Sequence, residues 1–203
     1  MFSLLKPFIF KVDPEIAHDL AIKSLRYNFL PEDIFKVENE SVLETKIFDT
    51  IIKNPIGLAA GFDKSAEVYN SLFKFGFGFI DVGTITPKEQ YGNPKPRVFR
   101  LENDRALINR LGFNNDGIDK VSKRLQKNSP SNFLGVNIGP NKDSENRIDD
   151  YLQCIKKIYS FANYITINIS SPNTPGLRDF HDKSTLQNLL KNITEFTKKN
   201  NEI

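Results

Sequence analysis

Four apolar segments each end in a cluster of small, amide or hydroxyl residues, which read AAGFDK, GTITP, NIGPNK and NISSPN. In three of them a short hydrogen-bonding side chain stands near the end of the segment: Thr84, Asn137 and Asn168. Such side chains can read the carbonyl and N–H groups of a planar ring. One alone is typical of a turn or a cap, whereas three at equivalent positions favour a shared polar ligand.

The first cluster combines small residues with a cation. Ala59, Ala60 and Gly61 lack side-chain bulk, so a flat ligand could lie against the backbone. Lys64 follows and could balance negative charge on that ligand. The alternative for Lys64 is a solvated lysine at the start of a helix.

A further polar stretch, NRLGFNN at 109–115, interrupts the rhythm between the second and third segments. Asn109, Arg110 and Asn114 offer amide and guanidinium donors, and Gly112 lets the loop turn. Taken alone, this signal is weak.

The sequence lacks the motifs of several common nucleotide and metal sites. AAGFDKSAE does not supply the GxGxxG of a dinucleotide site, and no Walker sequence is present. The two histidines, His18 and His181, have no partners that indicate a metal site, so we expect no metal. Acid–base chemistry therefore falls to serine, lysine or a carboxylate.

The clusters need elements that bring them together, and the sequence from about residue 45 predicts alternating strands and helices. Such alternation builds a parallel sheet with right-handed crossovers. Parallel α/β folds bind ligands at the carboxyl edge of the sheet, where all four clusters fall. We expect hairpins at 46–55 and 97–110, strands at 55–61, 77–87, 133–139 and 164–170, and helices at 64–76, 116–128, 148–162 and 184–200.

Apolar patterns predict which faces are buried. The last strand is apolar enough to be covered on both faces. Two helices carry apolar stripes, which predict inward faces formed by Ile118, Val121 and Leu125 in one and by Leu186, Leu189, Leu190 and Ile193 in the other.

Residues 1–40 form a second region, which is predicted to be helical. Asp13 followed by Pro14 is typical of a helix start, and Pro31 ends this helix. The region is either a cap packed on the main domain or an amphipathic membrane-surface element, because apolar residues such as Phe8 are costly to leave in water. One small or apolar face of the helix comprises Ile16, Ala17, Leu20, Ala21, Ser24 and Leu25.

Composition excludes several classes. The 203 residues are 39% hydrophobic and 26% charged, which allows one domain with a sizeable core and a small extra piece. The net charge of +3, without a basic block, argues against nucleic acid. Cys154 cannot form an internal disulfide, and its helical spacing predicts a buried thiol. No apolar run approaches the ~20 residues of a membrane span, and the start lacks the features of a signal peptide.

Together, NPIGLAAGFDK, GTITP, PRVFRL, INRLGFNN, GVNIGPNK and NISSPNTPGLR resemble the dihydroorotate dehydrogenases, flavin enzymes of pyrimidine synthesis. The resemblance implies an α/β fold, the (β/α)8 barrel. This chain would hold about the first four βα units at 41–203, after an N-terminal helical extension at 1–40. Because a full barrel takes about 250 residues, we expect the missing half from the rest of a longer chain or from a partner.

The resemblance also assigns roles to residues. It implies that Ser171 is the catalytic base, taking a proton from the carbon next to a carbonyl of dihydroorotate. The positions that match FMN contacts are Ala60, Gly61, Lys64, Thr84, Asn137 and Asn168. Those that match substrate contacts are Lys64, Asn109, Arg110, Leu111, Gly112, Phe113, Asn168 and Asn173.

The family divides by its base. The cytosolic class carries cysteine there, whereas the membrane-associated, quinone-dependent class carries serine and a helical extension. Ser171 and residues 1–40 resemble the second class. The resemblance implies oxidation of (S)-dihydroorotate to orotate with a membrane quinone as acceptor, and peripheral contact of residues 1–40 with the cytoplasmic face of a bacterial inner membrane.

Two alternatives stay open. One is another FMN barrel oxidoreductase, of the dihydropyrimidine or dihydrouridine type. Against it, NRLGFNN and Ser171 fit orotate chemistry, and no iron–sulfur cysteines are present. The other alternative is an inactive half-barrel fragment.

Overall fold

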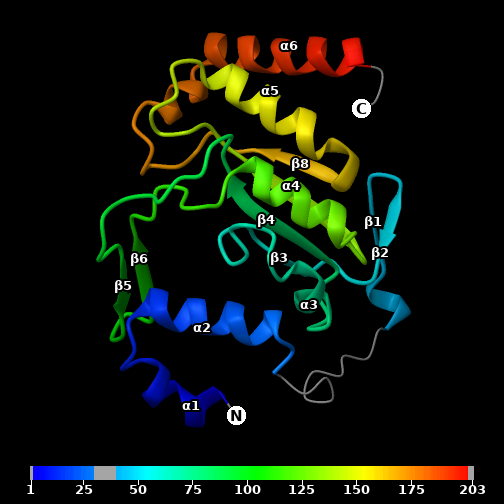
Figure 1. Ribbon diagram of the computed structural model, residues 1–203. Coiled ribbons are helices and arrows are strands. Elements are labelled where there is room, and N and C mark those ends of the chain that lie inside the picture. Colours follow the sequence, from blue (N-terminus) through cyan, green and yellow to red (C-terminus); the bar gives the residue numbers. More distant parts are fainter. Residues whose placement is uncertain (1, 30–39, 201–203) are drawn as a thin grey trace.

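A four-stranded parallel sheet forms the centre of the computed structural model, which describes residues 2–29 and 40–200. Chain order and sheet order agree, as in the wall of a barrel. All four strands run in the same direction, so their carboxyl ends share one edge (Figure 1). The predicted parallel sheet is confirmed, and its strands are β3 (Gly57–Leu58), β4 (Phe79–Ile85), β7 (Phe133–Ile138) and β8 (Tyr164–Ile167).

Helices follow the strands and cover the sheet. Figure 1 shows α4 and α5 crossing the same face, with α6 packed beside α5. The helices are α3 (Tyr69–Phe73), α4 (Ile118–Lys127), α5 (Arg147–Ile158) and α6 (Lys183–Asn200), and short 3-10 helices span Ser41–Leu43 (η2), Tyr159–Phe161 (η3) and Leu177–His181 (η4).

The core lies between the sheet and these helices. Every residue of β7 is buried, because a strand pairs with it on each side. Ile118, Val121 and Leu125 of α4 are at most 2% exposed, so the predicted inward face is confirmed. Cys154 of α5 is fully buried, as predicted.

Two elements are shorter than predicted. The first strand covers two residues instead of 55–61, and α3 begins at residue 69 instead of 64. The later start of α3 follows from Asp63, whose carboxylate accepts hydrogen bonds from the N–H groups of Glu67 and Val68, both at 2.8 Å. These bonds replace helical ones and hold a turn between the sheet edge and the helix. Helix α3 ends at Phe73 with Lys74 as its C-cap, so the predicted glycine cap lies two residues further on, where Gly76 turns the chain with a φ of 88°.

Two burial predictions are wrong. Residues Tyr164–Ile167 are only half-buried, because within the described residues β8 pairs with β7 alone. In α6, Leu189 is buried but Leu190 is 50% exposed. The predicted stripe of α6 therefore does not face the core as a whole.

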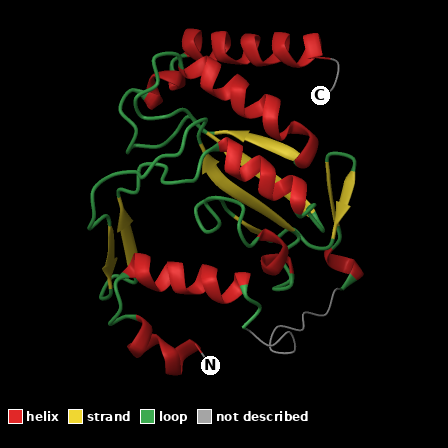
Figure 2. Ribbon diagram, in the orientation of Figure 1, coloured by secondary structure: helices red, strands yellow, loops and turns green. Residues whose placement is uncertain are grey.

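Two antiparallel hairpins stand outside the central sheet (Figure 2). One lies on the side of the sheet that carries the strand starts, and the other lies beside α2 (Figure 1). Both predicted hairpins are confirmed, as β1 (Thr45–Ile47) with β2 (Thr50–Ile52) and β5 (Val98–Leu101) with β6 (Ala106–Asn109).

The N-terminal region contains α1 (Phe2–Ile9) and α2 (Pro14–Arg26). The Asp13 carboxylate accepts hydrogen bonds from the N–H groups of Glu15 and Ile16, so the predicted start of α2 is confirmed. Within residues 2–29 and 40–200, no helix is long and apolar enough to cross a bilayer.

Two arginines of the β5–β6 hairpin dock this extension on that hairpin. Arg97, only 6% exposed, donates from Nη2 to Oε1 of Glu15 at 2.8 Å, and from Nε to both carboxylate oxygens at 3.1 Å. The hydrogen bond from Arg97 holds the pKa of Glu15 below its usual value. The guanidinium of Arg100 donates to the carbonyl groups of Phe10 and Val12. The extension and the β5–β6 hairpin are therefore joined by a buried ion pair and by hydrogen bonds from Arg100.

The inward face of α2 differs from the predicted one. Ile22 and Leu25 are buried, whereas Ile16 is 53% and Leu20 is 55% exposed. The helix ends at Arg26, and the predicted stop at Pro31 lies outside the described residues. The division between residues 40 and 41 stays a prediction.

Burial of Leu125 predicts a large stability effect. We expect Leu125→Ala to lower the free energy of unfolding by about 2–5 kcal/mol, because it removes apolar contacts and leaves a cavity. Leu20→Ala, on the exposed side of α2, should change it by less than about 0.5 kcal/mol. Urea denaturation measures both variants, and equal effects would contradict the described core.

Candidate functional site

A cavity of about 500 Å³, here called the strand-end cavity, opens where the parallel strands end. Residues from all four strand ends line it, together with the loop around 109–114 and the loop at 170–173. Every residue predicted to bind the cofactor or the substrate, and the predicted base, lines this cavity, with the exception of Arg110. The fold therefore brings together residues that the sequence spreads over more than 100 positions.

Asn137 stands at the centre of a hydrogen-bond network in this cavity. Its Oδ1 accepts from Thr84 Oγ1 at 2.7 Å and from Asn168 Nδ2 at 3.1 Å. Asn168 Nδ2 also lies 3.0 Å from Thr84 Oγ1. Thr84 and Asn137 are less than 10% exposed. The three side chains therefore form one polar surface, and the shared ligand expected for them stays a prediction.

Asp81 lies beside this network and was not singled out from the sequence. Its Oδ2 accepts hydrogen bonds from Asn137 Nδ2 at 3.3 Å and from Thr166 Oγ1 at 3.4 Å. Its Oδ1 is buried and has no hydrogen-bond partner among the described residues. Burial raises the pKa of this carboxyl group. The sequence did carry a signal for Asp81, because a carboxylate inside the otherwise apolar strand FIDVGT is unusual.

Ser171 and Asn173 lie on the loop that follows β8. The N–H of Asn173 donates to Ser171 Oγ at 3.3 Å, and the N–H of Ser170 donates to Asn168 Oδ1 at 3.2 Å. The second bond ties the loop to the polar network. Gly176, with a φ of 70°, turns the chain back toward α6.

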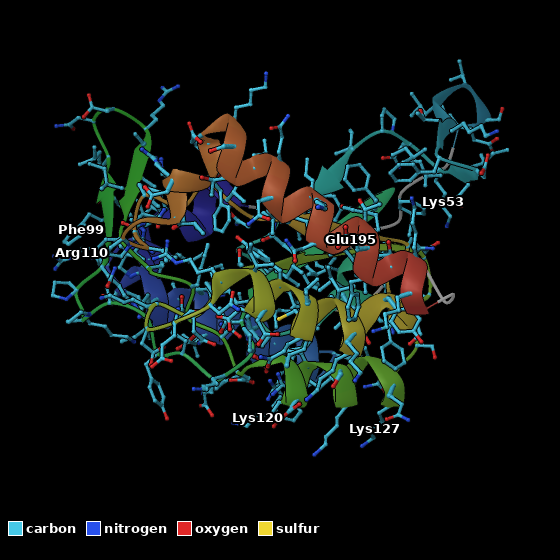
Figure 3. All side chains as sticks on the ribbon, turned by 90° about the horizontal axis from the view of Figure 1, so that it is seen from above. Lys53, Phe99, Arg110, Lys120, Lys127 and Glu195 are labelled. Atoms are coloured by element: carbon cyan, nitrogen blue, oxygen red, sulfur yellow. The ribbon has the colours of Figure 1, made fainter. Side chains whose placement is uncertain are left out.

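The loop at 109–113 contributes Asn109, Leu111, Gly112 and Phe113 to the cavity wall. Arg110 points elsewhere: its Nη2 donates to the carbonyl of Pro96 at 2.8 Å, and its guanidinium lies over the ring of Phe99 (Figure 3). The structure thus places Arg110 away from the cavity that holds the other predicted site residues.

A second cavity of about 580 Å³, the α2-side cavity, lies between the extension and the barrel wall. Residues Gly61, Lys64, Leu111 and Asn114 line both cavities. Lys64 Nζ lies 3.1 Å from Nε2 of His18 in α2. Sequence reasoning gave His18 no partner, because the two residues are 46 positions apart.

Amide and hydroxyl groups, together with Lys64 and Asp81, line the strand-end cavity, whereas the α2-side cavity also carries charged groups such as Glu15, Asp19 and Arg97. Burial lowers the pKa of Lys64 and also that of His18, where the neighbouring Lys64 charge adds to the effect. Within the described parts of the chain, no group of three or more histidine, cysteine, aspartate or glutamate side chains could hold a metal ion.

A wall of parallel strands with a polar cavity at its carboxyl edge defines a ligand-binding protein of the parallel α/β class. Residues 42–201 match the family described as Dihydroorotate dehydrogenase. The chain is 47% identical over 196 residues to the dihydroorotate dehydrogenase (quinone) of Idiomarina loihiensis, covering 95% of this chain and 59% of that protein. It is 50% identical over 188 residues to the protein of the same name from Brucella anthropi, covering 92% of this chain and 51% of that protein.

The fold comparison agrees. The crystal structure of DHODH from Eimeria tenella in complex with ferulenol matches with a TM-score of 0.85 at 44% identity, covering 92% of this chain and 52% of that chain. The chain belongs to the dihydroorotate dehydrogenase family, and it spans about half the length of the relatives it matches. The family and the barrel fold class expected from the motifs are confirmed.

Asp63, next to Lys64, predicts a pH dependence of stability. Burial raises its pKa to about 6 from an ordinary 3.8, so the folded chain binds this proton more tightly than the unfolded chain. The contribution of Asp63 to stability is therefore present below about pH 4 and falls by about 3 kcal/mol as the pH rises through 6.

We expect Asp63→Asn to remove this fall, measured as the free energy of unfolding in urea at pH 4, 5 and 6.5. Asp182 is the opposite case, because a hydrogen bond from Ser184 lowers its pKa. Asp182→Asn should remove stability that is present above the unfolded pKa and lost at lower pH. An Asp63→Asn variant with the same pH slope as the parent chain would contradict the assignment.

Proposed function

We propose that this chain provides the helical extension and the first half of the barrel of a quinone-dependent dihydroorotate dehydrogenase. Such an enzyme oxidises (S)-dihydroorotate to orotate in de novo pyrimidine (UMP) biosynthesis. The observation that carries the proposal is the Asn137-centred network at the strand ends, with Ser171 across the same cavity. Relatives named dihydroorotate dehydrogenase (quinone) support the choice of reaction.

The residues of the strand-end cavity fit an FMN ring. Gly61 has a φ of 112°, and a Cβ added there would meet nothing within 4 Å, so the backbone borders open space on this side. Ala60 beside it is also small, and the polar groups of Thr84, Asn137 and Asn168 stand on the same cavity wall. These residues and Lys64 would hold the ring, its polar edge meeting amides and a cation.

FMN, when bound, supplies the acceptor for the hydride that leaves the substrate. Ser171 takes the proton from the neighbouring carbon, next to a carbonyl group. A free serine is a weak base, so as it takes this proton its hydroxyl must pass its own proton on to solvent, and the site must lower the cost of that loss. The N–H of Asn173, 3.3 Å from Ser171 Oγ, stabilises negative charge on that oxygen.

The residues proposed to bind the substrate line the same cavity, with the exception of Arg110. Lys64 would balance the negative charge of the orotate carboxylate or ring. The remaining contacts would come from Asn109, Leu111, Gly112, Phe113, Asn168 and Asn173, with Arg110 included only if its guanidinium leaves Pro96.

The α2-side cavity is the proposed place for the quinone. It shares a wall with the strand-end cavity, so a second substrate there would lie close to the flavin. Residues 1–40 would contact the membrane surface, at the cytoplasmic face of a bacterial inner membrane. Exposed apolar side chains of the extension support this contact, among them Phe8 at 70% and Phe29 at 73% exposed.

The whole activity needs more barrel wall than this chain holds. Four parallel strands leave β8 unpaired on one side within the described residues. The remaining strands would come from the rest of a longer chain or from a partner. Two alternatives remain, a dihydropyrimidine or dihydrouridine oxidoreductase and an inactive half-barrel. Reduction of the flavin by dihydroorotate separates them from the proposed function.

The test is anaerobic stopped-flow reduction of the flavin-loaded protein by dihydroorotate. Ser171→Ala should slow flavin reduction by about 10²–10⁴-fold while FMN stays bound, because it removes the base. Ser170→Ala, at the neighbouring serine, is the matched control and should stay within a few-fold of the parent rate. Equal rates for Ser171→Ala and the parent would overturn the base assignment. Bleaching by dihydrouracil but not by dihydroorotate would favour the first alternative, and absence of any bleaching the second.

Membrane contact is tested by sedimentation with vesicles of phosphatidylethanolamine and phosphatidylglycerol. Phe8→Glu should weaken binding by about tenfold, because it removes the burial of one aromatic side chain. Phe48→Glu is the control, since Phe48 is 72% exposed at the turn of the β1–β2 hairpin. If both variants bind vesicles like the parent protein, residues 1–40 do not anchor the enzyme through Phe8.

A further inference from the structure

A polar contact joins the helical extension to the wall of the strand-end cavity. Lys64 Nζ lies 3.1 Å from Nε2 of His18, and Lys64 lines both cavities. His18 belongs to α2, whereas Lys64 follows the small residues that border the proposed flavin. The contact therefore runs from one proposed substrate site to the other.

The contact with Lys64 determines which ring nitrogen of His18 accepts a hydrogen bond and which carries the proton. An ammonium group can only donate, so Nε2 must carry the lone pair that accepts from Lys64. A neutral imidazole has one N–H group, so with Nε2 accepting from Lys64 the ring proton sits on Nδ1. The phenyl ring of Phe62, edge-on to the imidazole with centroids 5.1 Å apart, fixes the ring plane.

Helix α2 is itself held in place near His18. Glu15, one turn before His18, forms the buried ion pair with Arg97. A lysine side chain has four rotatable bonds, and it keeps most of its conformational freedom unless a fixed partner holds the ammonium group. A rigid helix with a fixed imidazole can supply that partner. The charged groups that face Lys64 and His18 are Glu15 and Asp19 of α2, Asp63 beside Lys64, and Arg97.

We propose that His18 is a positioning residue for Lys64: it holds the lysine ammonium at the wall shared by the two cavities, and so sets the affinity of the strand-end cavity for orotate. The inference rests on the proposed function and extends it, because it gives the extension a role on the dihydroorotate side. A molecule in the α2-side cavity that hydrogen-bonds to His18 competes with Lys64. Occupancy of one cavity is thereby coupled to affinity in the other.

The test is titration of the oxidised, flavin-loaded enzyme with orotate, followed by the change in flavin absorbance. His18→Phe keeps an aromatic ring against Phe62 but removes the acceptor, and it should weaken orotate binding by about tenfold. His18→Gln places an acceptor oxygen at a reach similar to Nε2, and it should restore affinity to within a few-fold of the parent enzyme. A structural role alone would instead make the aromatic variant the better one.

Unchanged orotate affinity in His18→Phe overturns the inference, as does a loss of equal size in His18→Gln. The proposed function is judged separately, by bleaching of the parent flavin with dihydroorotate. Bleaching of the parent together with unchanged affinity in His18→Phe would sink the positioning role and leave the proposed function standing. No bleaching of the parent would sink the proposed function itself.

A second measurement needs no disruptive variant. In the parent enzyme labelled with [¹⁵N]histidine, the His18 signals are identified by their absence from His18→Gln. At neutral pH the nitrogen shifts should report a neutral ring with the proton on Nδ1 and a bare Nε2. A proton on Nε2 would contradict the inference, because that nitrogen could not then accept a hydrogen bond from Lys64.

Discussion

The Asn137 amide joins three parallel strands at the edge where the strand-end cavity opens. Its oxygen accepts from Thr84 of β4 and from Asn168, just past β8, while its nitrogen donates to Asp81. In a buried site hydrogen bonds that share partners strengthen one another, and within the described residues Asp81 Oδ1 is the atom of this network left without a partner. The β4–β7–β8 register places these groups within reach, so the polar wall of the cavity depends on pairing deep in the sheet. The loop that carries Ser171 then starts from this fixed point, through the bond from Ser170 to Asn168.

The second organising feature is the ion pair that holds the extension against the β5–β6 hairpin. The pair between Glu15 and Arg97 is costly to break, since removing Glu15 would leave the buried Arg97 guanidinium without its carboxylate. This pair and the contacts of Arg100 place α2 over the α2-side cavity. The lysine at the shared wall then lies between two environments, one proposed for the pyrimidine ring and one for the quinone.

Much of this arrangement could be predicted from the sequence, because strand ends carry local signals. Small and amide residues after apolar segments indicated the cavity, and the motif order indicated the family. Long-range contacts left no such signal. Nothing in the spacing of His18 and Lys64 indicates that they touch, and the length of α3 depends on how the Asp63 carboxylate bonds to the backbone. The burial predictions were also wrong where burial depends on neighbours outside a single element, as for Leu190 and for the residues of β8.

The most direct test of the account is the flavin content of the purified enzyme with Asn137 replaced by leucine. Leucine has nearly the shape of asparagine but cannot form the hydrogen bonds that link Thr84, Asn168 and Asp81. We predict that Asn137→Leu keeps its circular dichroism spectrum and retains less than about a tenth of the parent's FMN, because it removes the polar wall proposed to hold the ring. A correctly folded Asn137→Leu enzyme with full flavin content and an unchanged flavin spectrum would contradict it.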